Sequence, residues 1–268
     1  MSQLIYFGGS GGGSIENLDA TYDSGTSSVV LTGNSSANTK GSPETLATTT
    51  AEWDGFWLCF GKTPASSSQR SLVDVSYQGF ADPADILAEN IFVMTATAGT
   101  TTAIWLPLRV PESETLQARL QTGGISQTIE CYVIGRRASD QSRPGFTKLT
   151  ALNVNTAATY PSSTDVPLTG SDTALHTTAA AYDALLAIAG PSPTGTPATT
   201  QSIYAQITAD GTTIGYGFPA ARSTNPILST GNLPLIEKAI ASGVSLGAKL
   251  TAATPGSDVL RVALYGLS

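Results

Sequence analysis

Short apolar segments alternate with breaks rich in Ser, Thr, Gly and Pro along nearly the whole chain. Within several segments, such as residues 72–77 and 259–265, polar residues interrupt the apolar positions at a period of two. That period is typical of a strand with one covered face and one wet face. Together with the frequent turn residues, it predicts an all-β fold of antiparallel strands.

The predicted strands fall into two sets, one in each half of the chain. The first set covers 28–32, 55–60, 71–77, 91–97, 102–107, 115–121 and 128–135, and the second covers 165–168, 184–189, 202–208, 212–218, 232–235, 244–251 and 258–264. About seven or eight strands per set is the number found in a β-sandwich or jelly roll. Segments 84–89, 174–186 and 236–241 are rich in Ala, Leu or Ile and could each carry a helical turn.

The two halves also resemble each other in sequence. Trp53-Asp54, before an apolar segment, is matched by Tyr182-Asp183 before another, at an offset of 129 residues (182 minus 53). Further matches follow in the same order: 17–22 with 155–160, 29–33 with 166–170, 106–108 with 233–235, 118–120 with 248–250, and 132–135 with 263–266. Each copy has the size of an independent domain, so we expect a tandem duplication.

This duplication sets the expected domain boundaries. Residues 15–137 form the first β-sandwich, 138–152 a polar linker with Pro and Gly, and 153–268 the second β-sandwich, related to the first. Residues 1–14 form a flexible arm rich in Gly and Ser. The apolar tip of this arm is either a disordered end or a strand that adds to a neighbouring subunit, and its residues are Leu4, Ile5, Tyr6 and Phe7.

Charge narrows the range of partners. Only 12% of residues are charged, about half the usual share, and the net charge is −7. Such a chain lacks the clustered Lys and Arg that a phosphate backbone requires, so we expect no nucleic-acid binding. No apolar run is long enough to cross a bilayer, and the N-terminus does not read as a secretory signal, so we expect no membrane insertion.

Residues for catalysis are scarce. His176 is the only histidine, and with Cys59 and Cys131 it cannot build a four-ligand zinc centre. No calcium loop or cofactor motif is present, and the acidic residues near 82–89 and 112–114 are not matched in the second half. We therefore expect no enzyme activity, no metal and no cofactor. Since Ile188 and Val262 replace the cysteines in the second copy, we expect buried free thiols rather than a disulfide.

Aromatic residues supply the remaining candidates. Trp53 and Tyr182 each precede Asp at a strand entrance, where the aromatic ring would close the end of the sandwich and the carboxylate would accept turn N–H groups. A role of Trp53 and Tyr182 as a glycan platform is the alternative. Further platform candidates are Tyr77, Tyr216, Trp57 and Trp105, although the last two lie in apolar runs where core packing is expected.

The duplicated sandwich pattern, the Ser/Thr/Ala/Gly-rich composition and the N-terminal arm resemble virion structural proteins of tailed bacteriophages and gene-transfer particles. The segments 106–120 and 233–250, each joining a strand pair through a loop with Pro or Gly, carry the same resemblance. The resemblance implies a capsid decoration, vertex, head-fibre, spike or tail-associated role in the virion, assembled in the host cytoplasm.

It also implies a homo-oligomer that contacts other virion proteins. The alternative function is a carbohydrate-binding adhesion module of a phage fibre or spike, whose partner is a host-surface polysaccharide. A third interpretation is a fragment of a bacterial surface-layer protein or adhesin.

Overall fold

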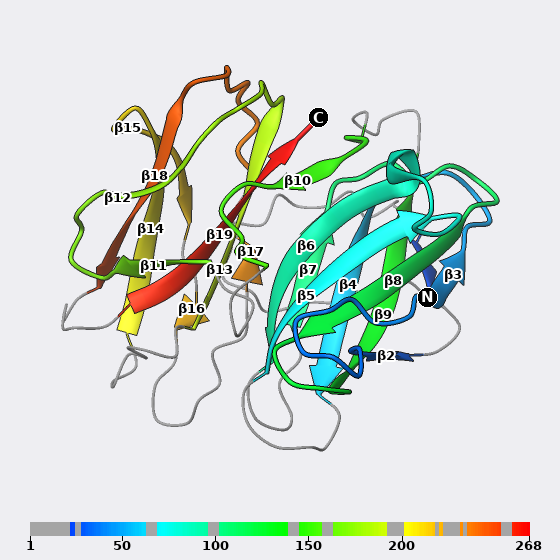
Figure 1. Ribbon diagram of the computed structural model, residues 1–268. Coiled ribbons are helices and arrows are strands. Elements are labelled where there is room, and N and C mark those ends of the chain that lie inside the picture. Colours follow the sequence, from blue (N-terminus) through cyan, green and yellow to red (C-terminus); the bar gives the residue numbers. More distant parts are fainter. Residues whose placement is uncertain are drawn as a thin grey trace, which may run out of the picture.

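Two antiparallel β-sandwiches lie side by side in the computed structural model (Figure 1). The structure describes residues 22–24, 28–62, 69–95, 102–138, 145–156, 163–191, 201–217, 220–221, 231–232, 235–252 and 259–268. Within these residues, strands dominate, and the one helical element is the 3₁₀ turn Pro83–Asp85. The prediction of an all-β fold is confirmed.

The strands divide between the sandwiches in chain order. The first sandwich contains β1 (Tyr22–Ser24), β2 (Val29–Thr32), β3 (Glu44–Thr48), β4 (Trp53–Lys62), β5 (Gln69–Tyr77), β6 (Ile86–Thr95), β7 (Thr102–Leu106), β8 (Thr115–Thr122) and β9 (Thr128–Arg137). The second contains β10 (Leu149–Ala151), β11 (Thr164–Pro167), β12 (Thr173–Thr177), β13 (Ala184–Pro191), β14 (Gln201–Ala209), β15 (Thr212–Gly217), β16 (Ala220–Ala221), β17 (Gly231–Asn232), β18 (Ser245–Ala252) and β19 (Val259–Leu267).

Both sandwiches have the same strand order. In the first, β9 pairs with β1 and β2 and is followed by β4 and β7, while the facing sheet runs β3–β8–β5–β6. In the second, β19 pairs with β10 and β11 and is followed by β13 and β17, while the facing sheet runs β12–β18–β14–β15. Two facing antiparallel sheets with these strand orders are typical of a jelly roll. The chain therefore repeats one topology twice.

Strand register identifies the equivalent residues. Phe56 pairs with Gly135 in the first sandwich, and Leu185 pairs with Gly266 in the second. This agrees with the sequence matches around 53, 119 and 132. The match of 29–33 with 166–170 is shifted by two residues, because Leu31 pairs with Ile129 whereas it is Val166 that pairs with Leu260, the counterpart of Ile129.

The sandwiches are joined through one sheet. β10 pairs antiparallel with β19 and forms a parallel bridge to β6, Leu149 to Ala88. A nine-stranded sheet therefore crosses from one sandwich to the other, with eight of its strands on one path and β11 beside β19. β10 lies in the segment 138–152 that was expected to be a linker. The expected linker therefore contains a strand of the second sandwich. This strand was not predicted because it is short and the sequence around it is polar.

Alternation on β13 and β19 produces two apolar faces. Leu185 and Leu264 face the core of the second sandwich, whereas Leu186 and Tyr265 belong to the core of the first. A strand that is buried on both faces has a nearly continuous apolar sequence, as both of these strands have. The first core therefore includes side chains from both sandwiches.

Two predicted helical turns are absent from the described residues, and two edge strands were not predicted. Residues 174–186, expected to carry a helical turn, form β12, a turn and the start of β13, and no helix is described at 236–241 either. β3 and β12 were missed because edge strands are short and polar, as in Glu44–Thr48 and Thr173–Thr177. Every predicted strand nevertheless overlaps a strand of the structure.

Candidate interaction surface

A buried aromatic corner is repeated in both sandwiches. The Trp53 ring lies against Gly135, where an added Cβ would fall 2.1 Å from the ring, and Tyr182 lies against Gly266 in the same way, at 2.2 Å. Trp53 is 1% exposed, so it offers no face to a sugar, and the ring of Tyr182 is half-buried. The Trp53 ring thus closes the corner as expected, whereas the neighbouring Asp54 carboxylate accepts from Arg136 Nε at 2.7 Å instead of from a turn N–H. The glycan-platform alternative does not fit the buried Trp53.

Polar contacts fasten this corner in the first sandwich. The Trp53 indole N–H donates to Asp23 Oδ2 at 3.1 Å, and Arg137 Nε donates to Asp23 Oδ1 at 2.8 Å. The hydrogen bond from Arg137 is the main reason why the pKa of Asp23 is lowered below its usual value. These contacts hold β1 against β9 at the edge of the sheet.

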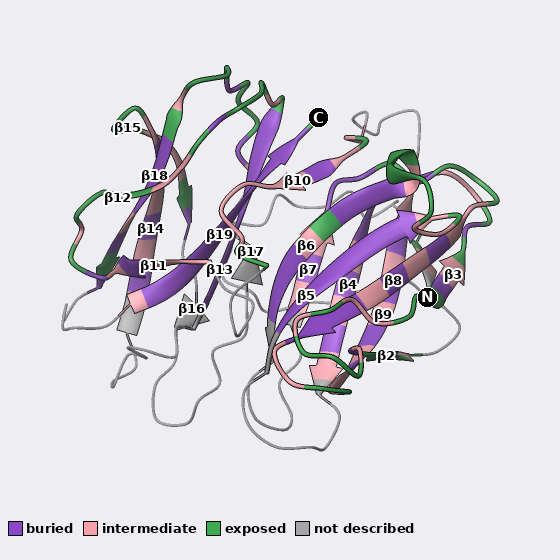
Figure 2. Cartoon of the chain, in the orientation of Figure 1, coloured by how far each residue is buried: buried purple, intermediate pink, exposed green. Residues whose placement is uncertain are grey.

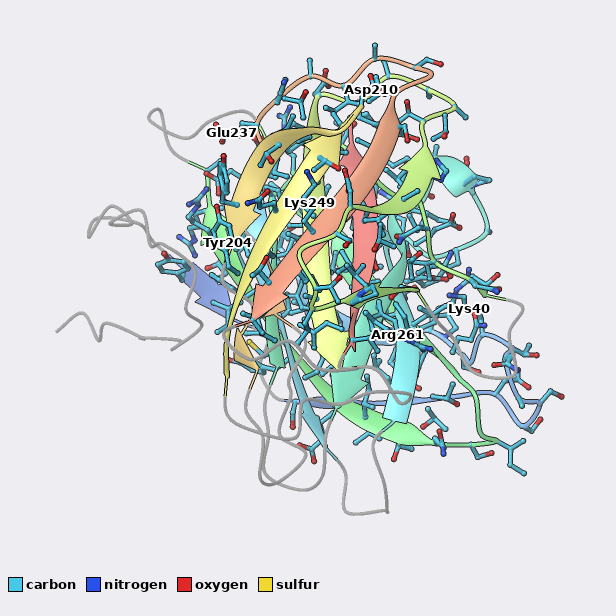
Figure 3. All side chains as sticks on the ribbon, turned by 90° about the vertical axis from the view of Figure 1, so that its left-hand side faces the viewer. Lys40, Tyr204, Asp210, Glu237, Lys249 and Arg261 are labelled. Carbon is cyan, nitrogen blue, oxygen red and sulfur yellow. The ribbon has the colours of Figure 1, made fainter. Side chains whose placement is uncertain are left out.

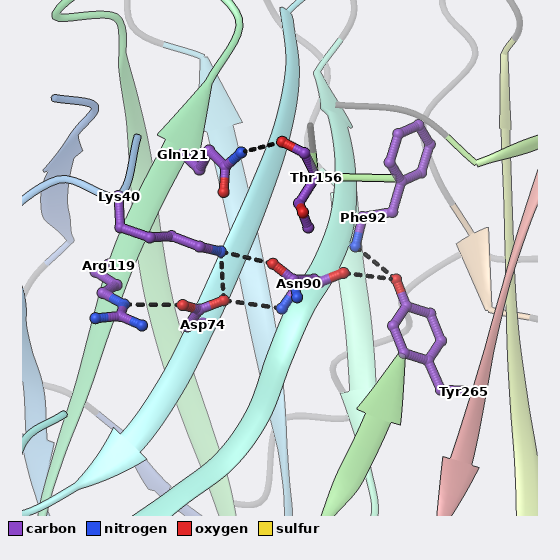
Figure 4. Close-up of polar contacts among 8 residues, drawn as sticks. All are labelled: Lys40, Asp74, Asn90, Phe92, Arg119, Gln121, Thr156 and Tyr265. Carbon is purple, nitrogen blue, oxygen red and sulfur yellow. Dashed lines mark hydrogen bonds and ion pairs between the residues drawn. The ribbon is translucent and has the colours of Figure 1, made fainter. Parts of the chain in front are cut away.

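A buried carboxylate organises the facing sheet of the first sandwich (Figure 4). Asp74, 1% exposed, accepts from Lys40 Nζ at 2.6 Å, from the Asn90 backbone N–H at 2.8 Å and from Arg119 Nε at 2.8 Å. Lys40 also donates to Asn90 Oδ1 at 2.8 Å. Burial lowers the pKa of Lys40, and the neighbouring Asp74 opposes that shift. Both Asp74 oxygens are used within the fold, so this cluster serves structure.

The same cluster extends to the second sandwich through Tyr265. The Tyr265 hydroxyl donates to the Asn90 carbonyl at 3.0 Å and accepts the Phe92 N–H at 2.7 Å, so it bonds to the backbone of β6 on both sides (Figure 4). Tyr265 is fully buried, and burial raises the pKa of its hydroxyl. A buried hydroxyl with both hydrogen-bonding roles satisfied fixes the distance between the two sandwiches.

Around Tyr265 lies the surface that we call the covered face. It is the side of β13 and β19 turned toward the first sandwich, and its buried residues are Ala184, Leu186, Ile188, Ala263, Tyr265 and Leu267. β13 contacts β6, and β17 contacts β7, so this face closes the side of the first sandwich between β6 and β7.

The equivalent surface of the first sandwich is less buried. We call it the aromatic face: the outer side of β4, β7 and β9, formed by Trp57, Cys59, Trp105, Tyr132 and Ile134. All five are half-buried. The Trp57 and Trp105 ring centroids lie 5.2 Å apart, and the Arg136 guanidinium lies 4.8 Å above the Trp105 ring. Core packing was expected for both tryptophans; the structure instead puts them on the outer side of the sheet.

Cross-strand pairs show that the two faces correspond residue by residue. Trp57 pairs with Ile134, as Leu186 pairs with Tyr265. Cys59 pairs with Tyr132, as Ile188 pairs with Ala263. The covered face and the aromatic face are therefore two copies of one surface.

The equivalent edge strands β6 and β15 also differ in how far they are buried. β6 is covered, with Leu87, Ala88, Ile91, Phe92 and Val93 buried. Its counterpart β15 is half-exposed or exposed along most of its length, as Figure 2 shows, and Tyr216 is 56% exposed. Tyr216 stacks on Tyr204 of β14, with centroids 5.8 Å apart and planes at 27°. Figure 3 shows Tyr204 on the outer side of this sheet.

Both cysteines of the chain lie in the first sandwich. Both cysteines are free, as expected; Cys131 is buried and Cys59 is half-buried. They point to opposite sides of the sheet, since Cys59 pairs with Tyr132 while Cys131 is opposite Phe60. Burial raises the pKa of the Cys59 thiol to about 11 and also raises that of Cys131.

The other candidate residues that the structure describes do not come together in a site. His176 is half-buried on β12, where burial lowers its pKa. No group of three or more His, Cys, Asp or Glu residues that could hold a metal occurs within the described residues. No helix in the described part of the chain has the length and apolar character of a membrane span. Leu4, Ile5, Tyr6 and Phe7 lie outside the described residues.

Tyr204, Tyr132 and Ile134 were not singled out from the sequence. In residues 128–137 one parity of positions supplies Ile129, Cys131 and Val133 to the core. The opposite parity contains Tyr132 and Ile134, which are also apolar. Apolar residues at both parities indicate two apolar faces, and this signal would have found the aromatic face.

No protein-family model and no curated protein matches this chain. Among solved structures, PNGF-II is similar over 94% of this chain, with 8% identity and a TM-score of 0.46, and the matched part is 66% of PNGF-II, just under two thirds of its length. The tandem CBM22-1-CBM22-2 domains of Paenibacillus barcinonensis Xyn10C match over 93% of this chain and 94% of theirs, with 8% identity and a TM-score of 0.27.

The infectious bursal disease virus VP2 subviral particle matches over 92% of this chain and 72% of its own, with 14% identity and a TM-score of 0.25. These likenesses concern the β-rich fold, and they are distant.

Proposed function

We propose that this chain is a non-enzymatic structural component of a bacteriophage-like particle, assembled in the host cytoplasm through contacts with itself and with other virion proteins. The observation that carries the proposal is the fusion of the two sandwiches. One sheet path and one shared core join them, and the buried Tyr265 is bonded to β6 at 3.0 and 2.7 Å. Such a junction makes a stiff block, which suits a particle component better than a hinged pair of domains.

The charged groups support the same proposal. Asp74, Asp54 and Asp23 each accept from an arginine within the fold, at 2.7–2.8 Å. Asp54 and Asp74 are buried and Asp23 is half-buried, and all three bind groups within the fold. Two apolar regions remain partly exposed, the aromatic face and the area around Tyr216, and both are suited to contacts between chains.

Mass spectrometry of purified particles tests this proposal. Particles from a host that carries the gene, purified by two unrelated gradients, should contain this chain in a fixed ratio to the shell protein through both steps. Absence of the chain from particles that contain the shell protein at full yield would refute the proposal.

A carbohydrate-binding adhesion module is the second candidate, and one observation favours it. The stacked pair Tyr204–Tyr216 presents an aromatic surface on the outer side of the second sandwich, with Tyr216 56% exposed. Aromatic rings of this kind can stack on sugar rings. Binding on a glycan array that is lost in Tyr216→Ala, and kept in the apolar surface variant Ile125→Ala, would support this second function.

A further inference from the structure

We infer that the side chains of Lys40 and Asn90 join in a covalent isopeptide bond, with the Asp74 carboxylate as the acid–base catalyst. The three side chains meet beside β5 and β6 (Figure 4). The reaction occurs once in each chain and has no other substrate, so it is compatible with a non-enzymatic protein. The inference goes beyond the proposed function and holds whether or not this chain belongs to a particle.

The contacts of Lys40 bring the reacting atoms together. Its Nζ lies 2.6 Å from Asp74 Oδ1 and 2.8 Å from Asn90 Oδ1. Because a C=O bond is about 1.23 Å long, Nζ lies within about 4 Å of Asn90 Cγ, the carbon that it attacks. That separation is close to the distance of about 3–3.5 Å at which bound groups are ready to react. Since a lysine ammonium only donates hydrogen bonds, it is the oxygen of the Asn90 amide that faces it.

The backbone of β6 holds Asn90 in this place. The register of β5 and β6 shifts between Val73 and Val75, which gives β6 one extra residue opposite Asp74. Bulges of this kind redirect a side chain and are frequent next to reactive sites. Asn90 has a φ of 58°, in the left-handed region, and its backbone N–H donates to Asp74 Oδ1 at 2.8 Å. One carboxylate oxygen therefore binds both the amine and the asparagine.

Burial of the cluster favours the reactive form of Lys40. Asp74 is 1% exposed and the Lys40 side chain is 22% exposed. Burial lowers the pKa of Lys40; the nearby Asp74 opposes that shift, and the charge of Arg119 adds to it. Arg119 Nε also donates to Asp74 Oδ2 at 2.8 Å and holds the carboxylate in position. In surroundings that exclude water, a single proton transfer can turn such an ion pair into a neutral amine and a neutral acid.

The reaction balances without any further reactant. Asp74 takes one proton from the Lys40 ammonium, and the freed lone pair of Nζ forms a bond to Asn90 Cγ while the C=O electron pair moves to Oδ1. The C=O bond then re-forms as the bond from Cγ to Nδ2 breaks, and Asp74 passes its proton to Nδ2. The second proton that Nζ sheds leaves with the ammonia. The products are one isopeptide bond and one ammonium ion.

The second sandwich does not repeat the cluster. Gln206 replaces Asp74 at the position opposite the basic residue of the neighbouring strand. Thr169 replaces Lys40 at the bridge two residues further along that neighbouring strand. These positions of the second sandwich thus have neither the amine nor the carboxylate, so we expect the bond in the first sandwich alone.

The bond would fasten the strand that carries the junction. Lys40 precedes β3, and Asn90 lies 50 residues later on β6, whose backbone binds Tyr265. A cross-link that closes a loop of this length stabilises a fold by restricting the unfolded chain, as a disulfide does. Unlike a disulfide, an isopeptide bond is not broken by a reductant.

Intact-mass spectrometry of the full chain tests the inference. Folded wild-type chains should be lighter than their sequence by one ammonia, and peptide mapping should find residues 40 and 90 in one cross-linked peptide. Lys40→Arg keeps the positive charge beside Asp74 but cannot form the bond, so it should have its full sequence mass. Lys249→Arg, at a lysine of the second sandwich, is the matched control and should lose ammonia as the wild type does.

Asp74→Asn tests the catalyst separately. The variant keeps the size of the side chain but cannot accept the proton, so chains that are folded by circular dichroism should keep their ammonia. A folded Asp74→Asn chain that forms the bond to the wild-type extent would overturn the role of Asp74. A wild type that keeps its full sequence mass after prolonged incubation would overturn the whole inference. So would a loss of ammonia that persists in Lys40→Arg, because it would come from another group.

Discussion

The covered face and the aromatic face are one surface in two settings. On the second sandwich it carries Leu186, Ala263 and Tyr265 and is buried against β6. On the first sandwich the same positions carry Trp57, Tyr132 and Ile134 and are half-buried. The same strand positions are therefore apolar in both halves, although it is the second sandwich that uses them at the junction between the sandwiches.

The largest difference in stability is expected between variants of Tyr265 and of its counterpart Ile134. Tyr265→Ala removes a fully buried ring at the junction and leaves the β6 backbone groups without partners, so it should lower the free energy of unfolding by about 3–5 kcal/mol. Ile134→Ala should cost about 1 kcal/mol, because Ile134 is only half-buried. Chemical denaturation at low protein concentration measures both, and equal losses would mean that the two faces do not differ in burial.

The buried carboxylate of the first sandwich should have the next largest effect. Asp74→Asn leaves Lys40 and Arg119 without their counter-charge and should cost about 3 kcal/mol. Gln206, its half-buried counterpart, accepts one hydrogen bond from Thr213, and Gln206→Ala should cost about 0.5 kcal/mol. Urea unfolding monitored by tryptophan fluorescence provides the comparison. A small loss for Asp74→Asn would show that the cluster is not needed for stability.

The repeated corner should respond alike in both sandwiches. Gly135→Ala and Gly266→Ala each place a methyl group within 2.1–2.2 Å of an aromatic ring, so each should cost about 1–3 kcal/mol through forced displacement. Differential scanning calorimetry of the two variants measures this. A corner that tolerates alanine in one sandwich but not in the other would show that the repeat does not extend to packing.

The smallest expected effect concerns the pH dependence of stability. The pKa of Asp23 is lowered in the folded state, mainly by Arg137, so the stability that Asp23 contributes is present above its unfolded pKa near 3.8. It is lost as the pH falls through the lower folded value. Asp23→Asn should therefore lower the thermal midpoint at pH 7 and have little effect at the acid end.

Thr150 is the matched control for Asp23, because it pairs with Gly266 as Asp23 pairs with Gly135. Thr150→Val should change the midpoint by the same amount at both pH values, since threonine does not titrate. A pH-independent loss in Asp23→Asn would contradict the role of its charge.

Much of this fold could be predicted because the relevant signals are local. Period-two patterns located the strands, and Trp53 and Tyr182 located the repeated corner. β10 escaped prediction because three residues between polar segments carry no periodicity. The aromatic face escaped for a different reason: sequence alone does not tell which of two apolar parities faces the core. Tyr265 shows the limit most clearly, since its partners lie 173 and 175 residues away.

Hydroxyl-radical footprinting of the full chain tests most directly the claim that one repeated surface is buried at the junction of the second sandwich and only half-buried on the first. Oxidation of Trp57, Trp105, Tyr132 and Tyr216 should exceed that of the buried Trp53 and Tyr265. Oxidation of Tyr265 at the same rate as Tyr132 would contradict the claim that the two faces differ in burial.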